Sequence, residues 1–120
     1  MTVTINTAAG NVEISTDVIA TIVGSSTTEI FGVVGMTSQK AVRDTTRSLL
    51  RQENYSRGVL VSADGNSVSI DVFVVVSYGV KISEVARNIQ ERVRFNLENQ
   101  LGLMDTKVNV YVQNVKVVAD

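Results

Sequence analysis

The stretch from Ser67 to Leu101 constrains the fold more than any other part of the sequence. It joins a Val-rich run, 67–78, to a run with helical spacing. Apolar side chains occupy every second position of the Val-rich run, which is the period of a β-strand. They are Val68, Ile70, Val72, Val74, Val76 and Tyr78. Because Phe73 and Val75 make the opposite face apolar too, we expect a central strand with neighbours at both edges.

The second run, 83–101, predicts an amphipathic helix. Its apolar residues are spaced three and four apart, as one buried helix face requires. This stripe comprises Ile82, Val85, Ala86, Ile89, Val93, Leu97 and Leu101. Charges of opposite sign lie four apart on the outer face, where ion pairs are expected; they are Arg87 with Glu91 and Arg94 with Glu98. Gly102 follows where helices often end in a left-handed residue.

A second Val-rich run, 107–117, follows the helix. The order strand, helix, strand predicts a β-α-β crossover with two parallel strands and a right-handed connection. The valines change face between Val112 and Val115. Either both faces of this strand are covered, or a bulge lies near Gln113–Asn114.

The N-terminal part of the chain has weaker patterns. Residues 1–6 suit a short edge strand or a loose arm, and Gly10–Asn11 suits a turn. Ser15 is a good cap for a helix that continues to about Thr28. We expect the buried face of this helix to comprise Val18, Ile19, Ile22 and Val23.

The remaining segments complete the outline. Phe31–Met36 predicts a buried strand or turn, and Ser38–Arg51 a second, polar helix. Val59–Val61 predicts a strand, joined to the long strand by a hairpin turn at Asp64–Gly65. The order β-α-β-α-β-β-α-β predicts one α+β domain over residues 1–120. Its mixed β-sheet should carry helices mainly on one face.

The residue types that the chain lacks limit its chemistry. It has no Cys and no His, so it has no thiol nucleophile, no thiolate metal site and no Ser-His-Asp arrangement. Asp64 suits a turn and Asp71 stands alone on a strand, so the two do not suggest a catalytic pair. We therefore expect a protein that is not an enzyme and has no cofactor and no metal.

The sequence also bears on localisation. The net charge is −1 and no run of eighteen apolar residues occurs, so direct membrane insertion is not expected. The N-terminal residues have neither a basic segment nor an apolar segment of the signal-peptide type. We expect a cytoplasmic protein.

A basic helix face is the main candidate interaction surface. Lys40, Arg43, Arg47 and Arg51 share one face of the predicted polar helix, and Arg57 lies nearby in the sequence. Residues 40–57 hold five basic and two acidic side chains, whereas residues 1–39 hold three acidic and no basic ones. This asymmetry could orient a charged partner or guide head-to-tail self-assembly. The alternatives are an RNA-binding face and a solvated helix face without a partner.

Three smaller features have structural and functional interpretations. Gly79 suits the tight turn between the long strand and the helix better than a phosphate site. Gly32-Val33-Val34-Gly35 matches the GxxG of KH-type RNA-binding domains in letters only. Tyr55 and Tyr111 suit either interface anchors or partial core packing.

Several segments together resemble the alkaline shock protein family, whose members are general-stress and cell-envelope proteins of Gram-positive bacteria. The matching segments are Gly10-x-Val12-x-Ile14-Ser15, Val18-Ile19, Gly32-Val33-x-Gly35-Met36, Ser56-Arg57-Gly58-Val59-x-Val61, Ile70-Asp71-Val72-x-Val74-x-Val76-x-Tyr78-Gly79-Val80, Glu84-Val85-Ala86-x-Asn88-Ile89-Gln90 and Val108-Asn109-Val110-x-Val112. The resemblance implies a non-catalytic envelope-stress protein that self-associates into a homo-oligomer. It also implies that the protein reaches the membrane through a membrane-anchored partner, with no catalytic residues to transfer.

Overall fold

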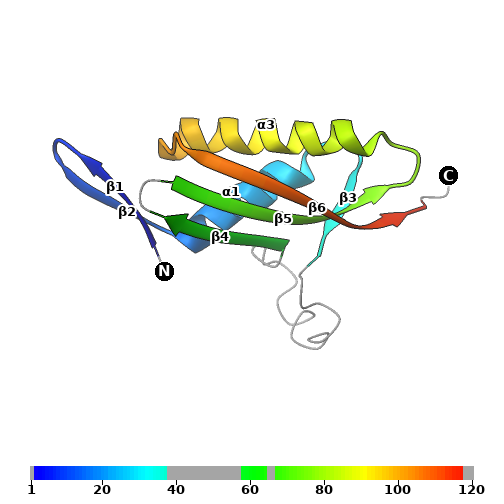
Figure 1. The fold of residues 1–120 in the computed structure, drawn as a ribbon, viewed down its shortest axis with the longest axis horizontal. Helices are drawn as coiled ribbons and strands as arrows, with labels where there is room; N and C mark the ends of the chain where they lie inside the picture. Colours follow the sequence, from blue (N-terminus) through cyan, green and yellow to red (C-terminus); the bar gives the residue numbers. More distant parts are fainter. Residues whose placement is uncertain (1, 38–57, 65–66, 118–120) are drawn as a thin grey trace, which may run out of the picture.

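The computed structural model describes residues 2–37, 58–64 and 67–117 (Figure 1). Its elements are β1 (Thr2–Thr7), β2 (Gly10–Ser15), α1 (Thr16–Thr28), β3 (Val33–Met36), β4 (Val59–Asp64), β5 (Ser67–Ser77), α3 (Ile82–Leu101) and β6 (Thr106–Lys116). The α+β class, the mixed sheet and the β-α-β crossover from β5 through α3 to β6 are confirmed. The predicted polar helix Ser38–Arg51 lies outside the described residues.

Strand β5 is the centre of the main sheet. Its first half pairs antiparallel with β4, from Val59↔Val72 to Asp64↔Ser67. Its second half pairs antiparallel with β3, which continues along the same edge. The opposite edge pairs in parallel with β6. The predicted central strand is therefore confirmed, although Tyr78 lies beyond its end and is exposed.

Of the two alternatives left open for the last strand, the structure shows the bulge near Gln113–Asn114. The pairing runs Val74↔Val112 and then Val75↔Asn114, so Gln113 has no partner across the sheet. One extra residue turns the following side chains to the other face. This explains why the valine pattern of the sequence changes phase at this position.

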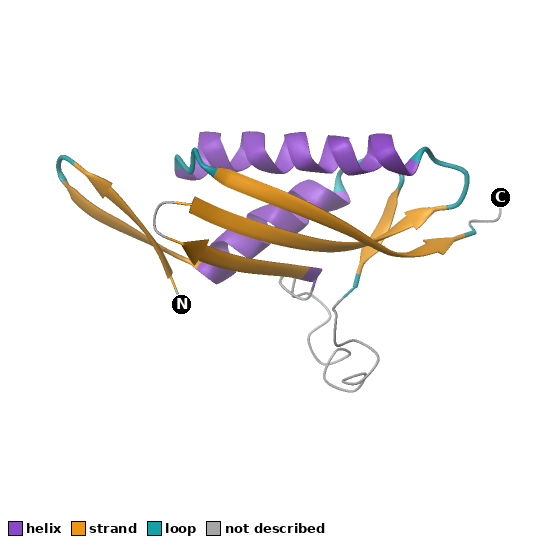
Figure 2. Cartoon of the chain, in the orientation of Figure 1, coloured by secondary structure: helices purple, strands orange, loops and turns teal. Residues whose placement is uncertain are grey.

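The two helices cover one face of the sheet (Figure 2). Alternate side chains of β5 enter a single core together with α1, α3 and β6. The fully buried members include Ile19, Val23, Ile70, Val72, Val74, Val76, Ile89, Val93 and Leu97. Phe73 points to the other face, where its ring stacks on Tyr111 with centroids 5.1 Å apart.

Helix α1 has the predicted start and end. The Ser15 hydroxyl accepts a hydrogen bond from the Val18 amide at 3.2 Å, and the helix ends at Thr28. Its buried face was partly wrong: Val18 is 45% exposed. The buried face instead includes Ala20, Gly24, Ser26 and Thr27.

Helix α3 is longer than expected by one residue at its start. Gly102 ends it in the left-handed conformation, with φ +73°. Ile82 was assigned to the buried stripe but is 41% exposed, because it occupies the first turn beyond the edge of the core. In the described part of the chain the charge pairs expected on the outer face do not form; Arg92 instead pairs with Glu29, the residue that follows α1.

Strands β1 and β2 form a separate two-stranded antiparallel sheet that projects from one end of the molecule (Figure 1). The reversal falls at residues 8–9, and Gly10 begins β2, so the turn expected at Gly10–Asn11 was displaced. The radius of gyration is 15.0 Å, whereas a compact domain of this length has about 14 Å.

Candidate interaction surfaces

The basic residues favoured by the sequence cannot be placed. Lys40, Arg43, Arg47, Arg51 and Arg57 all lie outside the described residues, as does Tyr55. The described part of the chain offers a different surface, a groove between the end of α1 and the outer side of α3.

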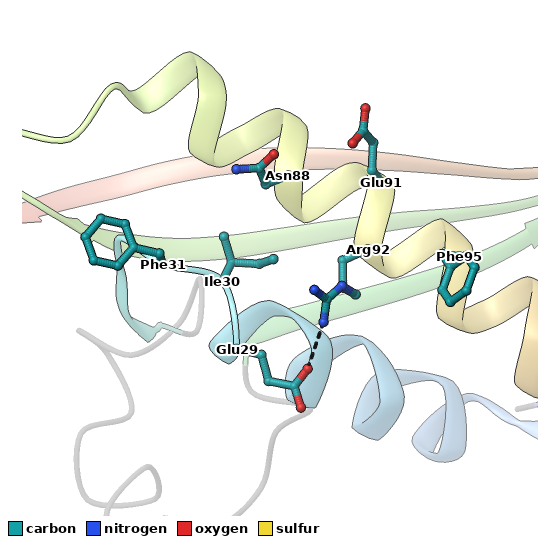
Figure 3. A pocket seen from close by; sticks show the side chains of 7 residues that line it. All are labelled: Glu29, Ile30, Phe31, Asn88, Glu91, Arg92 and Phe95. Carbon is teal, nitrogen blue, oxygen red and sulfur yellow. Dashed lines mark hydrogen bonds and ion pairs between the residues drawn. The ribbon is translucent and has the colours of Figure 1, made fainter.

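The groove encloses about 480 Å³ (Figure 3). It is lined by Glu29, Ile30, Phe31, Asn88, Glu91, Arg92 and Phe95. Two aromatic side chains stand at its ends: Phe31 is 89% exposed and Phe95 is 62% exposed. Large exposed aromatic rings on a rigid scaffold are typical of protein–protein contact sites.

The chain after α1 explains why Phe31 points outwards. Ile30 is buried in the core, and its amide donates to the Thr27 carbonyl at 3.1 Å. Gly32 then has φ +99°, and a Cβ placed there would lie 3.0 Å from the Val85 side chain. Between a buried anchor and a glycine pressed against α3, Phe31 has only the solvent side available. The sequence pattern predicts a buried strand or turn at Phe31–Met36; the turn and the strand are present, but the Phe31 ring is exposed.

The position of Phe95 follows from the helix period. Buried Val93 and Leu97 are part of the α3 stripe, and Phe95 falls between them on the outer side. The same spacing that identified the stripe therefore places Phe95 outside it. Phe95 is not among the interaction residues predicted from the sequence.

Polar contacts fix the two sides of the groove relative to each other. The Arg92 guanidinium lies 3.2 Å from a Glu29 carboxylate oxygen, and both side chains are about half exposed. Deeper between the helices, the Asn96 amide donates to the Ser26 hydroxyl at 2.6 Å, and that hydroxyl donates to the Ile22 carbonyl at 2.7 Å. This partly buried contact should hold the helices more strongly than the exposed ion pair, which solvent screens.

The sheet face opposite the helices carries a short row of polar and aromatic contacts. The Asn109 side chain donates to the Asp71 carboxylate at 2.9 Å, so Asp71 has a structural partner in the neighbouring strand. One row further, Tyr111 is 44% exposed while it stacks on buried Phe73. Leu60 of β4 is 50% exposed on the same face.

The smaller sequence features are placed as follows. Gly79 lies in the turn between β5 and α3 with φ +96°. Gly32 belongs to a turn, and Val33 and Gly35 belong to β3. A KH loop connects two helices, whereas this segment leads into a strand paired with β5.

The described residues contain neither a metal cluster nor a membrane-crossing helix. Within residues 2–37, 58–64 and 67–117, no three acidic side chains are grouped so that they could hold a metal ion. None of the helices in these ranges is long and apolar enough to cross a bilayer.

Comparison with known proteins gives the family of this chain. A model of the alkaline shock protein 23 family, described as having a cell envelope-related function, matches residues 4–117. The chain belongs to this family, as the resemblance in the sequence indicated. No solved structure gives a significant match.

Relatives are similar along nearly their whole length. Spy1614 of Streptococcus pyogenes serotype M6 is 63% identical over 120 residues, which cover 100% of this chain and 99% of the relative. YloU of Bacillus subtilis is 42% identical over 117 residues, 98% of each chain. YqhY of Bacillus subtilis is 32% identical over 111 residues, 92% of this chain and 81% of the relative. All three are described as uncharacterized proteins.

Proposed function

We propose that this chain is a non-catalytic module that serves the cell envelope from the cytoplasm. It acts through protein–protein contacts and self-association, and it reaches the membrane by binding a membrane-anchored partner. The family has a cell envelope-related function, which supports the general role. The groove flanked by Phe31 and Phe95 is the observation that carries the proposed mode of action.

The composition of the groove suits a protein partner. Aromatic rings at its ends can enter pockets of a partner, and such residues commonly dominate binding energy. Glu29, Glu91 and Arg92 supply charged groups between the two rings (Figure 3). Aromatic residues and Arg are both enriched in protein interfaces relative to the rest of the surface.

Crosslinking affinity purification from the native cell tests the proposal. The wild-type chain should recover a membrane-anchored protein from the membrane fraction, and the double variant Phe31→Ser with Phe95→Ser should lose most of it. Met104→Ser is a matched control, because Met104 is 71% exposed but does not line the groove. Equal recovery by the double variant and the control would contradict the role of the groove.

The same purification can also test the predicted basic residues. Arg43→Glu combined with Arg47→Glu should reduce partner recovery without unfolding the domain, which circular dichroism would check. Half of each sample is treated with nuclease. Recovery that collapses with nuclease would favour RNA binding, since phosphate-driven binding would also weaken steeply with salt.

A further inference from the structure

The β1–β2 hairpin carries an apolar face that the other described residues cover only towards its base. Cross-strand pairing places Val3 opposite Ile14 and Ile5 opposite Val12 on this face. Val3 and Ile14 are 5% and 8% exposed and belong to the core. Val12, towards the tip, is 48% exposed. The apolar pattern therefore continues beyond the part of the hairpin that the domain buries.

Such a hairpin is poorly stabilised by its own chain. A two-stranded hairpin is only marginally stable in water, and three strands or a covering layer are needed for independent stability. Here both outer edges of the β1–β2 sheet lack a third strand within the described residues. An additional strand or a covering surface would supply what the hairpin lacks.

Strand β6 offers a complementary edge. Within the described residues its only strand partner is β5. On the other edge the Val108 carbonyl accepts a hydrogen bond from the Gln90 side chain at 2.9 Å and the Val115 amide donates to the Asn114 side chain at 2.8 Å, so the stretch open to another strand lies between these two residues. The second half of β6 has exposed apolar groups: Tyr111 is 44% and Val115 is 38% exposed, and Val117 just beyond is 72% exposed. An edge without a strand partner is a template for strand addition.

The charges of the two segments are opposite in sign. Strand β6 contains Lys107 and Lys116 and no acidic residue. The hairpin, residues 2–15, contains Glu13 and no basic residue, and Asp17 follows in the first turn of α1. Complementary charge favours a contact between these segments and disfavours hairpin–hairpin or β6–β6 contacts.

The hairpin and the second half of β6 cannot meet within one chain. The hairpin projects from one end of the long axis, and the second half of β6 lies towards the other end (Figure 1). The molecule is 54 Å long. A contact between different patches at opposite ends is heterologous and relates successive copies head to tail.

We propose that the β1–β2 hairpin of one copy adds to the free edge of β6 in a second copy. The hairpin gains a third strand and a cover for Val12, and the β6 edge gains backbone hydrogen-bond partners. This inference rests on the self-association in the proposed function, and it names the two segments that meet.

Directed crosslinking tests the contact, since the chain has no Cys of its own. Asn11→Cys places a thiol near the hairpin tip, and Gln113→Cys places one on exposed β6. With a short bis-maleimide, a mixture of the two variants should give a covalent dimer, whereas each variant alone should not. Efficient dimer formation by either variant alone, or none in the mixture, would overturn the proposal.

A pair of valine variants tests the same contact by sedimentation. Val12→Lys puts a positive charge where the β6 lysines would approach, and should raise the self-association Kd about tenfold or more. Val18→Lys is the matched control, because Val18 is 45% exposed but lies on α1. Equal Kd values for the two variants, or a wild-type protein that stays monomeric, would contradict the inference.

The two proposals can fail separately. If the mixture does not crosslink but the phenylalanine variants lose the membrane-anchored partner, the hairpin contact is wrong and the proposed function stands. If the crosslink forms but no membrane-anchored protein is recovered, the self-association stands without the envelope partner.

Discussion

Strand β5 and the β1–β2 hairpin show the same alternating pattern with different outcomes. In β5 the alternate apolar side chains are all buried, because strands pair at both of its edges and the helices cover one face. In the hairpin the same alternation leaves Val12 exposed, because the domain reaches only the base. Alternation thus determines which face is apolar, whereas neighbouring elements determine whether that face is buried.

The largest expected loss of stability comes from a substitution in the buried core. Leu97 of α3 is fully buried in the core, and Leu97→Ala should lower the free energy of unfolding by about 2–5 kcal/mol. Val12→Ala at the hairpin should cost less than about 1 kcal/mol, since surface changes are usually small. Urea denaturation of both variants measures the contrast; similar costs would mean that the hairpin is as tightly packed as the core.

Substitutions of two turn glycines, Gly32 and Gly79, test how much each turn depends on a residue without a side chain. Gly32→Ala should cost about 1–3 kcal/mol, because its positive φ is combined with a Cβ position 3.0 Å from Val85. Gly79→Ala should cost less, since a Cβ there meets nothing within 4 Å and only the φ of +96° opposes it. Gly79→Val should cost more than Gly79→Ala, because β-branched residues tolerate positive φ poorly.

Gly35→Ala is the control for these variants. It has no positive φ, and nothing lies within 4 Å of its Cβ position. Thermal melts should rank the variants Gly32, Gly79 and Gly35 from most to least destabilised. A melt of Gly79→Val like that of the parent would contradict the backbone argument at that turn.

The contact between the helices should have an intermediate effect. Ser26→Ala removes the hydroxyl that joins α1 to Asn96 of α3, and should cost about 1–2 kcal/mol by leaving a partly buried amide without its partner. Thr28→Ala, an exposed change at the end of the same helix, is the control. A double-mutant cycle with Asn96→Ala should give coupling, and additive effects would exclude a direct interaction.

The smallest expected change in stability comes from the exposed ion pair in the groove. Arg92→Ala removes the exposed ion pair with Glu29, and should change stability by less than about 1 kcal/mol. Raising the salt concentration should reduce this small difference further, because screening weakens exposed pairs. A larger and salt-insensitive loss, measured by urea denaturation, would mean that Arg92 stabilises the domain in another way.

The central elements could be predicted from the sequence because local pattern and tertiary environment agree there. The periods of β5 and α3, the Ser15 cap, the Gly102 end and the bulge at Gln113 each have a local physical cause. Each cause depends on residues that are close together in the sequence, so the sequence pattern is enough to predict it.

The surfaces could not be predicted in the same way. The exposure of Phe31 depends on Gly32 packing against Val85, fifty-three residues away in the sequence. The exposure of Val18 depends on how α1 lies on the sheet, and that of Val12 on how far the domain extends. Such outcomes follow from the assembled fold. The basic face of Lys40, Arg43, Arg47, Arg51 and Arg57 stays a prediction.

Hydrogen exchange at two protein concentrations tests the difference between core and hairpin most directly. At low concentration the amides of β5 and α3 should exchange slowly, whereas those of the β1–β2 hairpin should exchange fast. At high concentration the hairpin and the free edge of β6 should both become protected, while β5 stays unchanged. Hairpin amides that are as protected as β5 at every concentration, or that never gain protection, would contradict the account.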